Sequence, residues 1–348
     1  MAHLAREAGP FRFTAPVALA ERPRGLALAA HQASMLFRWG LRGTPLLVAK
    51  HQSRAMGAAV RRAVAEFRPD AALVELAQTA QYLPCLDGVP TVLTDHEGGI
   101  PANATTDLGG WADRRDVRLW RAYVAAYYPR ADLVQAVTDE DGAQLRAMLG
   151  RPVATRLPVV RMPSHPAAKT RTPPRALFLG NYRHRPNPEA AEVLARDVLP
   201  RLRERMPDAE LWLAGPHPER LPSIGHLPGV RVVGFVEDLA GLFAQVRLLL
   251  APLFSGGGFR MKALSAMAHG VPVVTNALGA RGFAVPEPAR TVAEGTDALV
   301  QAALALLEDP RHAAAAGKAA HRWAAANLSP EAVAATQLER IQTLLVAR

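Results

Sequence analysis

Short apolar runs alternate with amphipathic stretches along most of the chain, which is typical of strands and helices in an α/β protein. In the first half, the pattern predicts strands at 71–75, 89–94 and 133–138, and helices at 55–67, 111–128 and 139–149. In the second half, it predicts strands at 176–179, 210–214, 230–233, 248–252 and 271–275. Further helices are predicted at 187–206, 238–245, 297–307, 311–327 and 330–346. Strands that alternate with helices in this way form parallel sheets flanked by helices.

A proline-rich stretch at 162–174, MPSHPAAKTRTPP, separates the two sets of elements and predicts a linker. We therefore expect a first domain over residues 1–165 and a second domain over 175–328. The last helix, within 329–348, is expected to pack back on the first domain. With 348 residues, of which 49% are apolar, the chain is long enough to bury two cores.

Composition predicts a cytoplasmic location. Cys85 is the single cysteine, so no internal disulfide can form, and this fits a reducing compartment. Residues 1–30 lack the continuous apolar core of a signal peptide. The most apolar region, at 239–254, is interrupted by Arg247 and Pro252 and is too short to span a bilayer.

The chain carries a net charge of +10, and nearly all of its positive charge is arginine. Such a charge favours an anionic partner, either a ligand or a membrane surface, although a compositional bias toward Ala, Arg and Pro explains it equally well. No nucleic-acid recognition motif accompanies it, so we expect no nucleic-acid partner. A peripheral contact with the inner face of the membrane fits the charge better.

The most informative stretch lies at 255–282, SGGGFRMKALSAMAHGVPVVTNALGARG. It predicts a glycine loop (Gly256, Gly257 and Gly258), a short helix and a buried strand. Glycines let backbone N–H groups approach a ligand, and the start of a helix favours an anion. Arg260 and Lys262 add two positive charges there. Together these features predict a site for a diphosphate.

The same stretch has a purely structural interpretation. Glycine runs before helices are common, and Met261, Leu264 and Met267 have the spacing of a buried helical stripe. Helix geometry also separates the two cations. Lys262 and Ser265, three residues apart, share one face, whereas Arg260 reaches the same ligand only if it still lies in the loop.

Four segments, in order, resemble a known family: residues 178–187 (FLGNYRHRPN), 208–216 (DAELWLAGP), 230–238 (VRVVGFVED) and 255–282. They are similar to the retaining, nucleotide-sugar-dependent glycosyltransferases of family 4, which have the GT-B fold. The resemblance covers residues 71–348 and is sharpest at 175–282. It implies two Rossmann-like domains that face each other across a cleft, with the nucleotide sugar held mainly by the second.

The resemblance also implies roles for individual residues. Arg260 and Lys262 would stabilise the leaving nucleoside diphosphate, and His96 would contact the transferred sugar or guide a proton. Asp95 and Glu97 match the family's acceptor-side loop. The remaining residues would bind the donor: Gly180, Asn181, Arg185, Asn187, Gly256, Gly257, Gly258 and Ser265. Asn187 has an alternative role as the N-cap of a helix, and His96 an alternative structural role.

The expected reaction is the transfer of a sugar from a nucleoside diphosphate sugar to a glycan, lipid-linked or small-molecule acceptor, with retention of configuration. We expect no cofactor and no metal, because the 11 histidines are scattered and the diphosphate charge is met by cations and the helix terminus.

The alternative is a catalytically silent relative that binds a nucleotide, a glycan or a partner protein. Two departures from the family favour that alternative. Ser265 stands where the family usually has a glutamate that binds the ribose, and residues 1–30 show no strand–glycine–helix signature, as if the first unit were truncated or divergent. An NAD-dependent enzyme is disfavoured, because no G-x-G-x-x-G follows a first strand.

Overall fold

The computed structural model describes residues 25–101, 109–163, 172–255, 260–282 and 284–347. Its contacts divide the chain into two compact units. The first comprises Met1–Ala136, Asp141–Thr155 and Arg340–Arg348, and the second comprises Val137–Glu140 and Arg156–Glu339. The chain thus enters the second unit ahead of the proline-rich stretch, and its last residues belong to the first unit. Arg340 accordingly donates hydrogen bonds to Gln135 Oε1 (2.9 Å) and to the Thr155 carbonyl (2.8 Å).

The first unit contains a parallel sheet in the order β1-β2-β3-β4. Its strands are β1 (Ala72–Glu75), β2 (Thr91–Asp95), β3 (Leu133–Ala136) and β4 (Ala154–Thr155). Its helices are α2 (Leu26–Gly40), α3 (Leu46–His51), α4 (Arg54–Phe67), α5 (Trp111–Tyr127) and α6 (Asp139–Leu149), with 3₁₀ segments η1 (Ala77–Cys85) and η2 (Tyr128–Arg130). The core is built on large, fully buried side chains, among them Leu93, Trp120 and Leu145.

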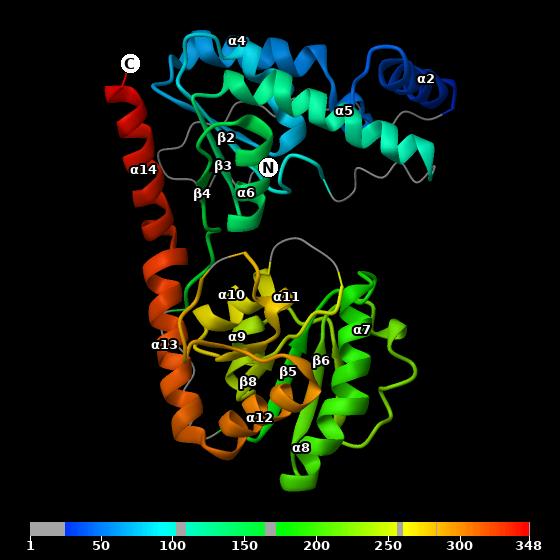
Figure 1. Ribbon diagram of the computed structural model, residues 1–348, viewed down its shortest axis with the longest axis vertical. Coiled ribbons are helices and arrows are strands. Elements are labelled where there is room, and N and C mark those ends of the chain that lie inside the picture. The colour runs from blue at the N-terminus through cyan, green and yellow to red at the C-terminus, as the bar shows by residue number, and fades with distance from the viewer. Residues whose placement is uncertain (1–24, 102–108, 164–171, 256–259, 283, 348) are drawn as a thin grey trace. The chain divides into compact units, whose positions relative to one another are not determined.

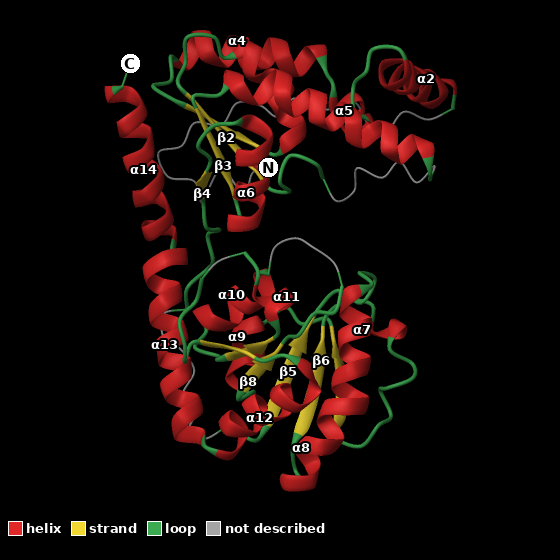
Figure 2. Cartoon of the chain, in the orientation of Figure 1, coloured by secondary structure: helices red, strands yellow, loops and turns green. Residues whose placement is uncertain are grey.

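The second unit contains a six-stranded parallel sheet in the order β10-β9-β8-β5-β6-β7 (Figure 2). Its strands are β5 (Arg175–Leu179), β6 (Glu210–Ala214), β7 (Val230–Gly234), β8 (Leu248–Leu250), β9 (Val273–Thr275) and β10 (Arg290–Val292). Its helices are α7 (Pro186–Val193), α8 (Leu199–Arg205), α9 (Leu239–Ala244), α10 (Met261–Ala268), α11 (Ala277–Ala280), α12 (Gly295–Glu308), α13 (Pro310–Leu328) and most of α14 (Pro330–Val346), with short segments η3 (Leu194–Val198) and η4 (Pro218–Arg220). This strand order is that of a Rossmann sheet.

Most predicted elements are present. The helix predicted at 187–206 is divided into α7, a π-helical turn η3 and α8, all along one path (Figure 1). The helix α2 was not predicted, nor were the short elements α3, β4, α11 and β10, which carry too little periodicity to be recognised. Within the described residues, no helix combines the length and the apolar character that a membrane span needs.

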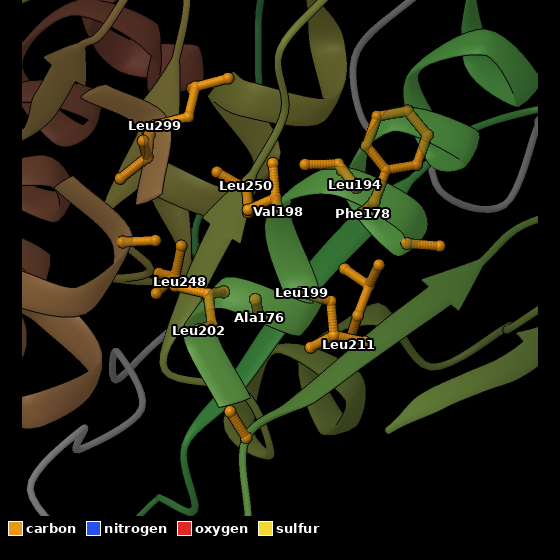
Figure 3. Packing of buried hydrophobic residues seen from close by; sticks show 14 of the residues in the cluster. Ala176, Phe178, Leu194, Val198, Leu199, Leu202, Leu211, Leu248, Leu250 and Leu299 are labelled. Carbon is orange, nitrogen blue, oxygen red and sulfur yellow. The ribbon is translucent and has the colours of Figure 1, made fainter. Parts of the chain in front are cut away.

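Helices cover both faces of the second sheet, which favours apolar side chains in its central strands, such as the fully buried Leu177, Leu213 and Leu249. On one face, Phe178, Leu199 and Leu250 pack with side chains of η3 and α12 (Figure 3). On the other face, α9, α10 and α13 contribute Phe243, Leu264 and other side chains to a second cluster. Of the stripe predicted on α10, Leu264 and Met267 are fully buried, whereas Met261 is exposed.

Candidate functional site

The candidate site lies at the point where the second sheet reverses its strand order. β5 and β8 are neighbours in the sheet, yet the helices that follow them, α7 and α10, belong to the clusters on opposite faces. In open α/β sheets, ligands bind outside the carboxyl ends of two such strands, because the diverging connections leave a crevice there. Gly180 and Asn181 follow β5, and the chain after β8 leads into α10. The fold therefore brings two of the sequence-predicted segments to one place.

Lys262, in the first turn of α10, is the centre of this arrangement. Its ammonium donates a hydrogen bond to Asn187 Oδ1 on α7 (2.6 Å) and lies 4.3 Å from the centroid of the Phe178 ring. Asn187 Nδ2 in turn donates to the Asn181 carbonyl (2.8 Å). These two contacts join α10, α7 and the loop after β5. Phe178 and the pairing of Lys262 with Asn187 were not predicted from the sequence.

Asn187 is buried and lies inside α7, so the alternative interpretation of this residue as a helix N-cap is wrong; the N-cap position is Arg185. Gly180 packs directly against Asn187, because a Cβ at position 180 would lie 2.7 Å from Asn187 Cγ. Gly215, at the end of β6, approaches the same loop, since its Cβ would lie 1.9 Å from the Gly180 carbonyl oxygen. Gly180 thus leaves room for the Asn187 side chain, and Gly215 allows two backbone segments to approach closely.

Burial, as the larger cause, and the nearby charge of Arg260 together lower the pKa of Lys262 to about 7. Desolvation disfavours the ammonium, and the neutral Asn187 side chain does not supply a compensating negative charge. The lysine is therefore poised to titrate near neutral pH. An anion bound beside it would favour its charged form.

Arg260 occupies the N-cap position of α10, and its side chain is buried. The guanidinium donates through Nη2 to the Leu278 carbonyl in α11 (2.9 Å), so part of its hydrogen-bonding capacity is used within the protein. Burial lowers its pKa, and Arg281 acts in the same direction while Glu140 opposes it. Arg260 thus contributes positive charge near Lys262 from outside the regular helix.

The other predicted donor-binding residues differ in their exposure and in their contacts. Arg185 is exposed and pairs with Glu189 (2.6 Å), and Glu189 Oε2 also accepts a hydrogen bond from Ser255 Oγ (2.5 Å). This second contact links α7 to the residue that precedes the glycine loop. Ser265 is half-buried on α10, three residues after Lys262. The predicted Gly256, Gly257 and Gly258 lie outside the described residues.

In the first unit, the loop after β2 holds the predicted acceptor-side residues. His96 Nε2 lies 2.9 Å from Glu75 Oε2, a partner on β1 that the sequence did not suggest. Glu97 is exposed. Asp95 is fully buried, and its carboxylate accepts hydrogen bonds from the backbone N–H groups of Glu97 (2.7 Å) and Gly99 (3.1 Å). It also accepts the hydroxyl of Tyr128, whose pKa is raised by burial and by the carboxylate. Asp95 therefore shapes the loop from inside, and its place on the acceptor side stays a prediction.

Asp95→Ala is expected to lower the free energy of unfolding by about 3 kcal/mol, because it leaves a buried hydroxyl and two N–H groups without their acceptor. Urea denaturation measures this change. The matched control is Asp87→Ala, an exposed aspartate of the same unit, which should change stability by less than about 0.5 kcal/mol. Equal effects of the two substitutions would contradict the role of Asp95.

Among the described residues, no three His, Cys, Asp or Glu side chains are arranged so that they could hold a metal ion. The groups gathered at the end of the second sheet are instead a lysine, an arginine, two asparagines and the start of a helix. Such a set suits an anionic ligand rather than a cation.

The sequence of the second domain is similar to that of known proteins. Residues 173–309 match the family model described as glycosyl transferases group 1. A curated relative, a GDP-mannose-dependent alpha-(1-6)-phosphatidylinositol monomannoside mannosyltransferase of Mycolicibacterium smegmatis, is 34% identical over 157 residues. That alignment covers 40% of this chain and only 41% of the relative, so the similarity spans less than half of either protein.

Solved structures are similar over a larger share of the chain. Sucrose-phosphate synthase from Thermosynechococcus elongatus superimposes with a TM-score of 0.62 at 20% identity, covering 84% of this chain and 78% of that protein. Anabaena HepE, solved with UDP and glucose, gives a TM-score of 0.59 at 14% identity, covering 82% and 81%. The chain therefore has the GT-B fold of two Rossmann-like domains, and the match to the family model lies within its second domain.

Proposed function

We propose that this chain is a glycosyltransferase that moves a sugar from a nucleoside diphosphate sugar to an acceptor, with retention and without a bound metal. The observation that carries the proposal is the position of Lys262 in the first turn of α10, at the reversal of strand order, with its ammonium on Asn187 Oδ1. This position lies inside the segment that matches the family. An anionic group at the carboxyl end of β8 would meet both the lysine and the start of the helix.

The chemistry assigned to these residues is stabilisation of a leaving group. When the bond between the anomeric carbon and the diphosphate breaks, negative charge develops on the departing phosphate oxygen. A cation and backbone N–H groups that are already in place stabilise that charge more than they stabilise the bound donor. Lys262 would supply the cation nearest the diphosphate, and Arg260 would add to the positive potential. In the first domain, His96, held by Glu75, remains our candidate for contact with the transferred sugar.

Two donor classes are the first to test. The curated relative is named as GDP-mannose-dependent, and HepE was solved with UDP and glucose. A thermal-shift screen of the purified chain against UDP, GDP, ADP, dTDP and their sugars would separate them. A nucleotide at 100 times its dissociation constant should stabilise the fold by about 2.7 kcal/mol, which gives a measurable shift. A matching sugar donor should then release its nucleoside diphosphate when a glycan, lipid-linked or small-molecule acceptor is added.

No shift with any nucleotide would contradict the proposal and favour a silent relative that binds a glycan or a partner protein. Retention is tested separately, by following the anomeric configuration of the first-formed product by NMR. Metal independence predicts unchanged turnover after treatment with a chelator. Loss of all turnover, restored by Mg²⁺ or Mn²⁺, would contradict that part alone.

Ser265→Glu is expected to tighten nucleotide binding about tenfold. Ser265 shares the face of α10 with Lys262, and a carboxylate there would accept hydrogen bonds from two ribose hydroxyls, each charge-assisted. Isothermal titration with the identified nucleotide measures the effect. Ser265→Gln has a similar length without the charge and serves as the control. Equal affinity of wild type and Ser265→Glu would show that the ribose is not bound at this face.

A further inference from the structure

Helix α2 carries a set of exposed apolar side chains near its carboxyl end. Leu36 and Phe37 are about half exposed, at 48% and 50%, and Leu41, directly after the helix, is 79% exposed. The alanines one and two turns earlier, Ala29, Ala30 and Ala33, are exposed as well. These positions recur at intervals of three and four, so they form one continuous side of the helix.

The carboxyl end of α2 is attached to α5 by specific contacts. Trp39 is buried, donates through Nε1 to Asp116 Oδ1 on α5 (2.9 Å), and lies 5.8 Å from Trp111 between ring centroids. Arg115 Nη2 donates to the Gly40 carbonyl (2.6 Å), with its guanidinium over the Trp39 ring. In Figure 1, α2 accordingly lies beside the first part of α5. These contacts fix the end of α2 on α5, while Leu36, Phe37 and Leu41 stay exposed.

The sequence that contains this helix is strongly basic. Residues 22–65 contain neither aspartate nor glutamate, and they contain eight basic residues: Arg22, Arg24, Arg38, Arg42, Lys50, Arg54, Arg61 and Arg62. On α5, the exposed Arg114, Arg118 and Arg121 follow Trp111 at intervals of three or four. They line a hollow of about 660 Å³ together with Trp111, Val117 and Asp113. A second hollow, of about 450 Å³, shares Arg121 and extends to Ile100, next to the loop after β2.

We propose that this surface, the α2–α5 face (Leu36, Phe37, Leu41, Trp111, Arg114 and Arg118), docks on a bilayer that contains anionic lipids. Apolar side chains on an exposed helix insert at the boundary between headgroups and acyl chains, and tryptophan is favoured at that depth. Neighbouring arginines pair with lipid phosphates and are attracted by the negative surface potential. A second copy of the chain fits less well, because an isologous contact would bring two acid-poor, arginine-rich surfaces together. The proposal does not depend on the transfer reaction.

The test is cosedimentation of the full chain with vesicles of phosphatidylcholine alone and of phosphatidylcholine with 30% phosphatidylglycerol, at low and high salt. We expect binding to the anionic vesicles that weakens as salt rises, because salt screens exposed charges. Arg114→Ala and Arg118→Ala should each reduce the partition coefficient about fivefold. Phe37→Ser should reduce it about tenfold, because an aromatic side chain no longer leaves water. These positions are exposed, so all three variants should keep the wild-type melting temperature.

Matched substitutions on the second unit serve as controls. Arg322→Ala removes an exposed arginine from α13, and Leu338→Ser removes a leucine that is 56% exposed on α14. Both should leave vesicle binding unchanged. Failure of the wild type to bind anionic vesicles, or equal losses in variants and controls, would overturn the proposal. It would also be overturned if light scattering showed a dimer that Phe37→Ser dissociates, since the face would then be a contact between copies.

Discussion

Lys262→Met is expected to abolish stabilisation by the nucleoside diphosphate and to lower turnover about 10²- to 10³-fold, the size of effect seen when one preorganised charge-stabilising group is lost. The methionine keeps the stem that packs beside Phe178 but lacks the ammonium that Asn187 Oδ1 accepts. Thermal shift with the identified nucleotide and release of nucleoside diphosphate from the donor measure the two effects.

The same substitution should raise the melting temperature of the empty protein. The ammonium is desolvated and its pKa is lowered to about 7, so the folded state without ligand carries an unfavourable charge that methionine removes. A variant that is more stable when empty and yet unresponsive to nucleotide cannot be explained by misfolding. Lys318→Ala, an exposed lysine on α13, is the control and should behave as wild type. A normal nucleotide shift in Lys262→Met would refute the assignment of this lysine to the donor site.

Affinity for the donor is expected to fall as pH rises above 7, by up to about tenfold per pH unit. In the empty site, the pKa of Lys262 is about 7, because burial and Arg260 disfavour the ammonium. A bound diphosphate favours the ammonium and raises that pKa. At a pH between the pKa of Lys262 in the empty site and its pKa in the occupied site, binding must therefore take up a proton. Affinity is greatest below pH 7, where the lysine is already charged.

The stability of the empty protein depends on pH in the opposite direction from the affinity. An ordinary lysine has a pKa near 10.4 when unfolded, above the value of about 7 in the fold. The unfolded state therefore binds more protons between these values, and this group makes the empty fold more stable as pH rises from about 7 toward 10. Titration calorimetry in buffers of different ionisation enthalpy counts the protons taken up. The nucleotide sugar is the better ligand for this measurement, because both of its phosphates are esterified and stay ionised. Proton uptake that persists in Lys262→Met would place the titrating group elsewhere.

The sequence predicted the second domain more completely than the first. β6 and α14 have the bounds that the apolar pattern predicted, because a buried strand and a long amphipathic helix each carry a periodic signal. Lys262 was identified for a related reason, since the glycine loop, the cation and the helix start are adjacent in the chain. The likeness of four consecutive segments to one family extended this prediction to the GT-B fold, which the comparisons confirm.

Contacts between distant residues were decided only by the tertiary structure. The partner of Lys262 lies 75 residues away, and the hydroxyl that binds Asp95 lies 33 residues away. Sequence alone therefore placed Asp95 in a loop after a strand, and only the fold shows that this side chain is buried. Arg260 likewise turns to the Leu278 carbonyl, a contact that no spacing encodes.

Local periodicity determines which residues form each helix or strand, because it depends on the side chains of one segment. Tertiary packing determines which side chains meet, how far each is removed from water and, through that desolvation, the charge state of Lys262. The identity of the cation at the candidate site thus came from the sequence, while its partner, its burial and its pKa came from the fold.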